Sequence, residues 1–211
     1  MIREYILSLI SRMNTPEDIS TSHNSVRWRA YREAEQISDV TYLPVLENII
    51  CEHNRPSDKK TRNSAYFILG KIIKNRFNVS ACKFLICRLS IEKDKYILSN
   101  MLDRLADICI PTDMDIEPII VLSKNENSII RHSAINALGS CESEKCKLAL
   151  RYYSDQEDEK KYKYEIIYAN ASLGKIGDVT DIPLLQKHSD SRIKDIREST
   201  RYAINEINKR N

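Results

Sequence analysis

Glycine, proline and tryptophan are scarce in this sequence, whose 211 residues include 4 Gly, 6 Pro and one Trp. Proteins built from β-strands need many turns, and glycine and proline are among the residues that turns use most. The small number of these residues, with few aromatic residues other than tyrosine, argues against a β-sandwich or a barrel. The composition therefore favours helices joined by short loops.

Long apolar runs are also missing. No apolar segment approaches the roughly 20 residues that a membrane-spanning helix needs. The stretch from Tyr5 to Ile10 is short, is interrupted by Ser8 and lies between Arg3 and Arg12, which is not the pattern of a secretory signal. The sequence therefore predicts no membrane association, and the cytoplasm is the expected location.

Cysteine spacings typical of metal or redox motifs are absent. None of the six cysteines belongs to a Cys-x-x-Cys pair, and two pairs, Cys82/Cys87 and Cys141/Cys146, are five residues apart. A separation of five places two thiols on different sides of a helix. We expect reduced, mostly buried thiols that pack as small apolar side chains.

Familiar catalytic motifs are not found either. The chain has no glycine-rich phosphate-binding loop with Gly-Lys-Ser/Thr, no Gly-x-Ser-x-Gly and no His-Glu-x-x-His, and these are the motifs that most directly indicate catalysis. None of the four histidines is followed by Glu. The sequence therefore predicts a protein that is not an enzyme, with no cofactor and no metal, and a monomer is expected.

One ten-residue skeleton recurs along the chain. Residues 130–139, Ile-Arg-His-Ser-Ala-Ile-Asn-Ala-Leu-Gly, share an Arg-x-x-Ala core with residues 61–70, are matched in part by residues 196–204, and have a shorter copy at residues 26–30. Equivalents of Gly139 follow one another at spacings of 31 to 36 residues. Self-similarity at a nearly fixed period is the signature of a repeat architecture.

A second motif lies between these segments. Residues 39–46, Asp-Val-Thr-Tyr-Leu-Pro-Val-Leu, match residues 178–185, Asp-Val-Thr-Asp-Ile-Pro-Leu-Leu, and weaker copies lie at 113–118 and 78–80. The Thr two residues after the first Asp is expected to supply an N-capping oxygen, and the proline falls in the first helical turn. Each repeat is therefore predicted to contain a capped helix, a short loop and an Arg-x-x-Ala helix.

These units resemble HEAT repeats, in particular the short bacterial subclass that is similar to phycobilin-lyase repeats. The matching residues are Arg62-x-x-Ala65-x-x-x-Leu69-Gly70, Arg131-x-x-Ala134-x-x-Ala137-Leu138-Gly139 and Ala169-x-x-x-Leu173-Gly174. The resemblance implies an all-α fold, an α-α superhelix (a HEAT-like solenoid) of about six helical hairpins whose stacking forms one continuous core.

A single repeat domain spanning residues 1–211 is expected. It would begin with an N-terminal capping helix at 1–20. The repeats are placed roughly at 22–53, 57–91, 92–123, 128–153, 162–188 and 191–211.

The family resemblance also assigns positions to the two helices of each repeat. In the family, the capped helix lies on the convex side and the Arg-x-x-Ala helix lines the concave side. If this holds here, the arginines form a ladder that pairs with loop acids and ties one repeat to the next; the alternative is that they are ordinary surface arginines. The residues of the expected ladder are Arg27, Arg62, Arg131, Arg197, Asp39 and Asp178.

The concave face is the expected binding surface. Positions one, four and five after the arginine should point outward from the concave helices. The residues expected to contact a partner are Trp28, Tyr31, Arg32, Asn63, Tyr66, His132 and Asn136. Because Trp, Tyr and Arg are enriched in binding hot spots, the N-terminal half is predicted to carry the main surface.

Basic charge is concentrated between residues 55 and 76. This segment has a local balance of +6, with Asp58 as its acidic residue. The basic patch is expected to consist of Arg55, Lys59, Lys60, Lys71, Lys74 and Arg76. An anionic partner, either an acidic protein or nucleic acid, could dock there; an ordinary solvated surface is the alternative, because the net charge of the whole chain is only +3.

The sequence thus predicts a bacterial protein–protein interaction module, an adaptor or an immunity-type scaffold, that binds its partner on the concave face. The alternative is a DNA- or RNA-binding protein that resembles the HEAT-like alkylpurine DNA glycosylases. Those enzymes use an acid flanked by tryptophans, whereas the single Trp28 has no such cluster around it. Phycobilin lyases fit the repeat type, but no residue specifies a chromophore pocket. Deoxyhypusine hydroxylases hold iron with His-Glu pairs, which this chain lacks.

Overall fold

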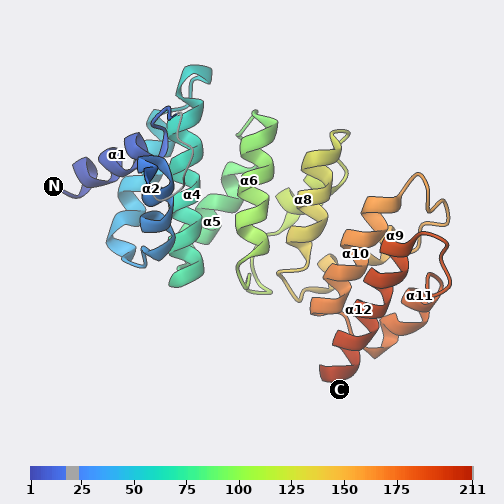
Figure 1. Ribbon diagram of the computed structural model, residues 1–211. Coiled ribbons are helices and arrows are strands. Elements are labelled where there is room, and N and C mark those ends of the chain that lie inside the picture. The colour runs from blue at the N-terminus through green and yellow to red at the C-terminus, as the bar shows by residue number, and fades with distance from the viewer. Residues whose placement is uncertain (18–23, 211) are drawn as a thin grey trace. The chain divides into compact units, whose positions relative to one another are not determined.

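The computed structural model describes residues 1–17 and 24–210, and the secondary structure of these residues is helical throughout, without a strand (Figure 1). The α-helices are α1 (Ile2–Met13), α2 (Val26–Gln36), α3 (Leu43–Glu52), α4 (Lys59–Asn75), α5 (Val79–Arg88), α6 (Lys95–Ala106), α7 (Glu117–Ser123), α8 (Ser128–Leu138), α9 (Glu144–Ser154), α10 (Lys163–Ile176), α11 (Ile182–Gln186) and α12 (Lys194–Arg210). The 3-10 helices η2 (Val40–Tyr42), η3 (Pro56–Asp58) and η4 (Val179–Asp181) lead into α3, α4 and α11. The predicted all-α class is confirmed.

The chain forms two compact units, Met1–Arg104 and Leu105–Asn211. In the first unit, α1 packs against α2, α3 packs against α4, and α2 also packs against α4. In the second, α7 packs against α8, α9 against α10 and α11 against α12, while α10 also contacts both α8 and α12 (Figure 1). Within each unit, α4, α8, α10 and α12 each pack against the helix that precedes them, and the pairs α2/α4, α8/α10 and α10/α12 also pack together, which is the stacking of an α-α solenoid.

The expected capping helix at 1–20 and the first repeat from residue 22 both extend into residues 18–23, which lie outside the described residues. The repeat boundaries stay a prediction. Among the helices described, none is both long and apolar enough to cross a bilayer.

In the two full copies of the capping motif, the first residue supplies the capping oxygen, whereas in the 113–118 copy Asp115 accepts from the Glu117 backbone N–H. The Asp39 carboxylate accepts a hydrogen bond from the Thr41 backbone N–H at 2.9 Å, and Asp178 accepts one from the Thr180 N–H at 3.0 Å. Asn78 caps α5 in the same way. The expectation that Thr41 and Thr180 supply the capping oxygens is therefore wrong, because an Asp side chain reaches the N–H two or three residues ahead more directly.

Small residues allow the Arg-x-x-Ala helices to approach one another closely. Ala65 and Ala134 are fully buried, as the apolar spacing predicts. A Cβ built on Gly139 would lie 2.8 Å from the Ser172 side chain, and one on Gly174 would lie 3.0 Å from the Ala203 Cα. The sequence interpretation of these glycines as helix ends is incomplete, because Gly174 lies within α10. Its close approach to the next helix explains why a glycine is needed there.

Candidate functional site

Arg62 makes a buried connection between two consecutive repeats. Its Nε donates to Glu92 Oε2 at 2.6 Å, and Nη1 donates to the backbone carbonyls of His53 and Arg55 at 2.8 and 3.1 Å. Burial alone would raise the pKa of Glu92, but its hydrogen bond to Arg62 and two backbone N–H groups lower it below the ordinary value. The carboxylate is therefore charged at neutral pH.

Arg131 repeats this arrangement in the second unit. Its Nε donates to Glu165 Oε1 at 2.7 Å, and Nη1 donates to the carbonyls of Asn125 and Glu126 at 2.7 and 3.0 Å. Arg197, on α12, donates to the Ser191 carbonyl in the corresponding loop. Each of these arginines thus satisfies carbonyls of the loop that precedes its own helix.

The acids predicted for the ladder are not its partners. Asp39 and Asp178 cap the helices that follow them, and Asp178 pairs with Lys147 Nζ at 2.9 Å. Arg62 and Arg131 donate to the loops before their own helices and pair instead with Glu92, which precedes α6, and with Glu165 on α10. Arg27 is exposed and lies over the Tyr31 ring at 5.9 Å.

Position four after the arginine is buried in the interior repeats. Tyr66, expected at the partner surface, is 0% exposed, and its hydroxyl accepts a hydrogen bond from Arg88 Nε. The equivalent Ile135 and Asn170 are also fully buried. This part of the prediction is wrong because an Arg-x-x-Ala helix is covered by its neighbour in the stack as well as by its own capped helix, so its buried arc is wider than one apolar stripe.

The other predicted contact residues lie at or near the surface. Trp28 is 43% exposed, and the Arg32 guanidinium lies 5.7 Å from its ring centre. Tyr31 is half-buried against the edge of Phe67. Asn63 accepts a hydrogen bond from Asn100. Of the predicted contact residues, Trp28 and Arg32 are exposed, and Arg32 pairs with Glu35 at 2.8 Å. The half-buried ones are Tyr31, Asn63, His132 and Asn136.

The basic segment does not form one continuous patch. Arg55, Lys59 and Lys60 lie at the start of α4, whereas Lys71, Lys74 and Arg76 lie at its end. Lys59 and Lys71 are about 18 Å apart along the helix at 1.5 Å per residue. Lys59 Nζ also pairs with Asp94 at 2.6 Å. The structure thus divides the predicted patch into two smaller clusters.

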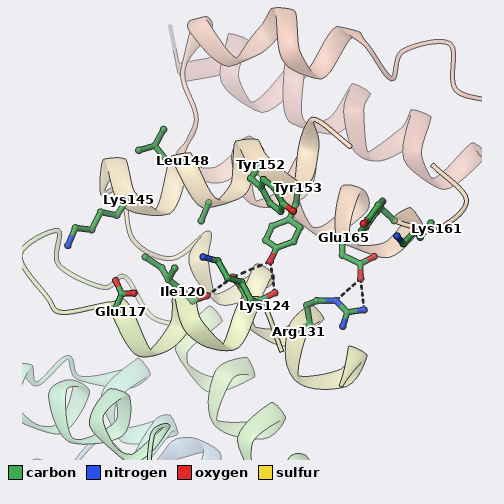
Figure 2. A pocket seen from close by; sticks show the side chains of 13 residues that line it. Glu117, Ile120, Lys124, Arg131, Lys145, Leu148, Tyr152, Tyr153, Lys161 and Glu165 are labelled. Atoms are coloured by element: carbon green, nitrogen blue, oxygen red, sulfur yellow. Dashed lines mark hydrogen bonds and ion pairs between the residues drawn. The ribbon is translucent and has the colours of Figure 1, made fainter. Parts of the chain in front are cut away.

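A groove that the sequence did not reveal lies between α7 and α9 (Figure 2). It has a volume of about 890 Å³, within the range of ligand pockets, which is roughly 300–1,000 Å³. Its lining consists of Glu117, Ile120, Ser123, Lys124, Arg131, Lys145, Leu148, Ala149, Tyr152, Tyr153, Lys161, Tyr162 and Glu165. All of these residues belong to the second unit.

The spacing of the two helices is held by Tyr153. Its hydroxyl donates to the Ser123 carbonyl at 2.6 Å, which joins the end of α7 to α9. Burial raises the pKa of Tyr153, so the phenol stays protonated and keeps this donor. The floor of the groove is therefore tied in place from one capped helix to the next.

The α9 wall of the groove is apolar and exposed. Leu148 is 58% exposed and Tyr152 is 61% exposed. They are four residues apart on α9, so they lie next to each other on one face of the helix. Exposed apolar residues that line one hollow together mark interaction sites more strongly than the same residues scattered singly.

Most charged residues lie at the two ends of the groove, and Lys124 lies between them (Figure 2). Figure 2 shows Glu117 and Lys145 at one end, and Arg131, Glu165 and Lys161 at the other. Burial alone would raise the pKa of Glu165, but the Arg131 hydrogen bond, aided by a backbone N–H and His132, lowers it. The Arg131–Glu165 pair is therefore fully ionised and neutral as a unit.

His132 lies against the same carboxylate. Its Nε2 is 3.2 Å from Glu165 Oε1, and its ring is 5.5 Å from the rings of both Tyr164 and Tyr168. Both tyrosines are exposed. Counting positions one, four and five missed them because they lie two residues before and two residues after Ile166, which occupies the arginine position in that repeat. Among the described residues, no group of three His, Cys, Asp or Glu side chains could hold a metal ion.

Comparison with known proteins defines the fold of the chain but not its family or function. No protein-family model matches the chain, and no curated protein matches it in sequence. An engineered protein of known crystal structure has a TM-score of 0.55 and 15% identity, with 97% of each chain covered. Two designed armadillo repeat proteins have TM-scores of 0.51 and 0.52 at 12% identity, covering 96% of this chain and 99% of theirs, and one was solved in complex with the peptide (KR)4. At such identities the likeness concerns the fold alone: the chain is a helical repeat solenoid.

Proposed function

We propose that this chain is a non-catalytic protein–protein interaction module that binds a linear segment of a partner protein in the groove between α7 and α9. The observation that carries the proposal is the groove itself: an open hollow of about 890 Å³ with an exposed apolar wall formed by Leu148 and Tyr152 on α9. The HEAT-like character of the repeats, and a role as an adaptor or immunity-type scaffold, are part of the same proposal.

The design of the groove supports binding better than it supports chemistry. Tyr153 and the Arg131–Glu165 pair are occupied by contacts within the chain, so they hold the shape of the site and have no free group to offer a reaction. The exposed side chains that remain are Leu148, Tyr152, three lysines and Glu117. A designed armadillo repeat protein, similar in fold, was solved with a peptide bound, and this agrees with a peptide as the occupant here.

A peptide-display selection tests the proposal. A random peptide library would be panned against the whole chain, and the selected peptides measured by fluorescence anisotropy. We expect a Leu148→Ala/Tyr152→Ala double variant to lose at least about tenfold in affinity, or about 1.4 kcal/mol. Both side chains are largely exposed, so helical content should be unchanged.

Trp28→Ala is the matched control, because it removes an exposed aromatic side chain from the other unit. Selected peptides should bind this variant like the parent chain. If no peptide is enriched, or if the double variant binds as well as the parent, the groove is not the site. If Trp28→Ala is the damaging change, the N-terminal surface predicted from the sequence is the site instead.

A further inference from the structure

Three lysines border the groove without an acidic partner. Lys124 on α7, Lys145 on α9 and Lys161 before α10 line it, and all are exposed. None of the three forms an ion pair within residues 1–17 and 24–210. Charged residues on a protein surface can lie unpaired at little cost, but three lysines around one hollow create a positive potential within it.

The neighbouring charges do not cancel this potential. Arg131 and Glu165 neutralise each other, and the guanidinium also donates to two backbone carbonyls. Glu117 is the other acid in the lining, and Figure 2 places it at the end near Lys145. Asp158 also lies near Lys161, because its carboxylate accepts a hydrogen bond from the Lys161 backbone N–H at 3.1 Å. Three lysines against Glu117 and Asp158 leave the groove with a net positive charge, which attracts an anion.

Between the charged ends, the groove offers aliphatic and aromatic contact. Leu148, Ile120 and Ala149 carry no hydrogen-bonding side-chain group, and an apolar side chain placed against them would leave water. A sugar–phosphate backbone would bury polar groups against the same residues without compensation. The lining thus favours a protein segment over nucleic acid.

We propose that the groove selects an acidic segment, in which an apolar side chain packs between Leu148 and Tyr152 and flanking carboxylates face Lys124 and Lys161. This inference rests on the proposed function, because it assigns the chemistry of the segment that the groove binds. Charge complementarity of this kind sets specificity and association rate more than total affinity.

Three pools of fluorescent peptides of equal length test the inference. Each has a central Leu or Trp, and the flanking positions are drawn from Asp/Glu, Asn/Gln or Lys/Arg. We expect the acidic pool to bind at least about tenfold more tightly than the basic pool at low salt, and this preference to shrink as salt screens the charges. A Lys124→Glu/Lys161→Glu variant should reverse the order of the acidic and basic pools. A Lys175→Glu/Arg192→Glu variant changes the net charge equally at exposed positions outside the groove and should preserve the order.

The outcomes separate the two proposals. If all three pools bind alike and lose affinity together in the Leu148→Ala/Tyr152→Ala variant, the groove binds peptides but charge selection is refuted. If no pool binds, or none responds to that variant, the proposed function fails as well. If a single-stranded RNA homopolymer binds more tightly than the acidic pool and displaces it, both are overturned in favour of nucleic acid.

Discussion

Arg131 and Glu165 are 34 residues apart in the chain, and their side chains meet with Nε and Oε1 at 2.7 Å. The same guanidinium donates to the carbonyls of Asn125 and Glu126. One side chain therefore joins the loop before α8 to α10. Because backbone carbonyls need hydrogen-bond donors, this arginine both satisfies the loop and fixes the next repeat beside it. Arg62 does the same with Glu92 in the first unit.

The first prediction concerns Arg62. Its side chain is 6% exposed and that of Glu92 is 3% exposed, so Arg62→Ala would leave a carboxylate buried without its counterion. We expect a loss of about 3–5 kcal/mol in the free energy of unfolding, measured by urea denaturation. Arg27→Ala, at the equivalent but exposed position, should change it by less than about 0.5 kcal/mol. Equal effects of the two changes would show that the ion pair does not stabilise the stack.

The second prediction is a loss of stability in acid. The pKa values of Glu92 and Glu165 are lowered in the folded chain, so the unfolded chain binds protons more readily. The contribution of these pairs is therefore complete above the ordinary glutamate pKa of about 4.3 and is lost as the pH falls through the lower folded values. Urea denaturation between neutral pH and acid should show this decline. In Glu92→Gln the decline should be shallower; an unchanged slope would contradict the assignment.

The third prediction concerns close helix packing. A Cβ on Gly139 would come within 2.8 Å of Ser172, so Gly139→Ala should cost about 1–3 kcal/mol through overpacking. The adjacent Ser140 is a useful control, because its buried hydroxyl has no hydrogen-bond partner among the described residues. Ser140→Ala should be neutral or stabilising. If Gly139→Ala melts at the parent temperature, the helices are farther apart than described.

Sequence reasoning found what repeats along the chain and missed what depends on distant contacts. The burial of Ala65 and Ala134 followed from local apolar spacing, since each needs only one neighbouring helix. Tyr66 was misplaced because its environment depends on a second neighbour in the stack. The groove left no local pattern either: the Tyr153 hydroxyl and the Ser123 carbonyl that set its width are 30 residues apart. The packing of α7 decides which part of the α9 surface stays exposed. The sequence of either helix taken alone does not predict that packing.

The last prediction tests whether the shape of the groove matters for binding. Tyr153 and Tyr152 are adjacent, but only Tyr153 is buried, and its hydroxyl ties α9 to the end of α7. Tyr153→Phe keeps the ring and removes the hydroxyl. The Ser123 carbonyl then loses its hydrogen bond from this side chain. We expect a loss of about 1–3 kcal/mol in the free energy of unfolding, the usual cost of an unsatisfied buried polar group.

Tyr153→Phe should also lower peptide affinity. Without this hydrogen bond α7 and α9 are free to separate, so the apolar wall of Leu148 and Tyr152 no longer faces a hollow of fixed width. Tyr152→Phe is the matched control: it removes an exposed hydroxyl, keeps the apolar wall, and should leave both stability and affinity at the parent values. Denaturation and anisotropy on the two variants would settle the point. If Tyr153→Phe is less stable yet binds peptides as tightly as the parent chain, the spacing of α7 and α9 does not define the site, and the exposed face of Leu148 and Tyr152 on α9 is sufficient for binding.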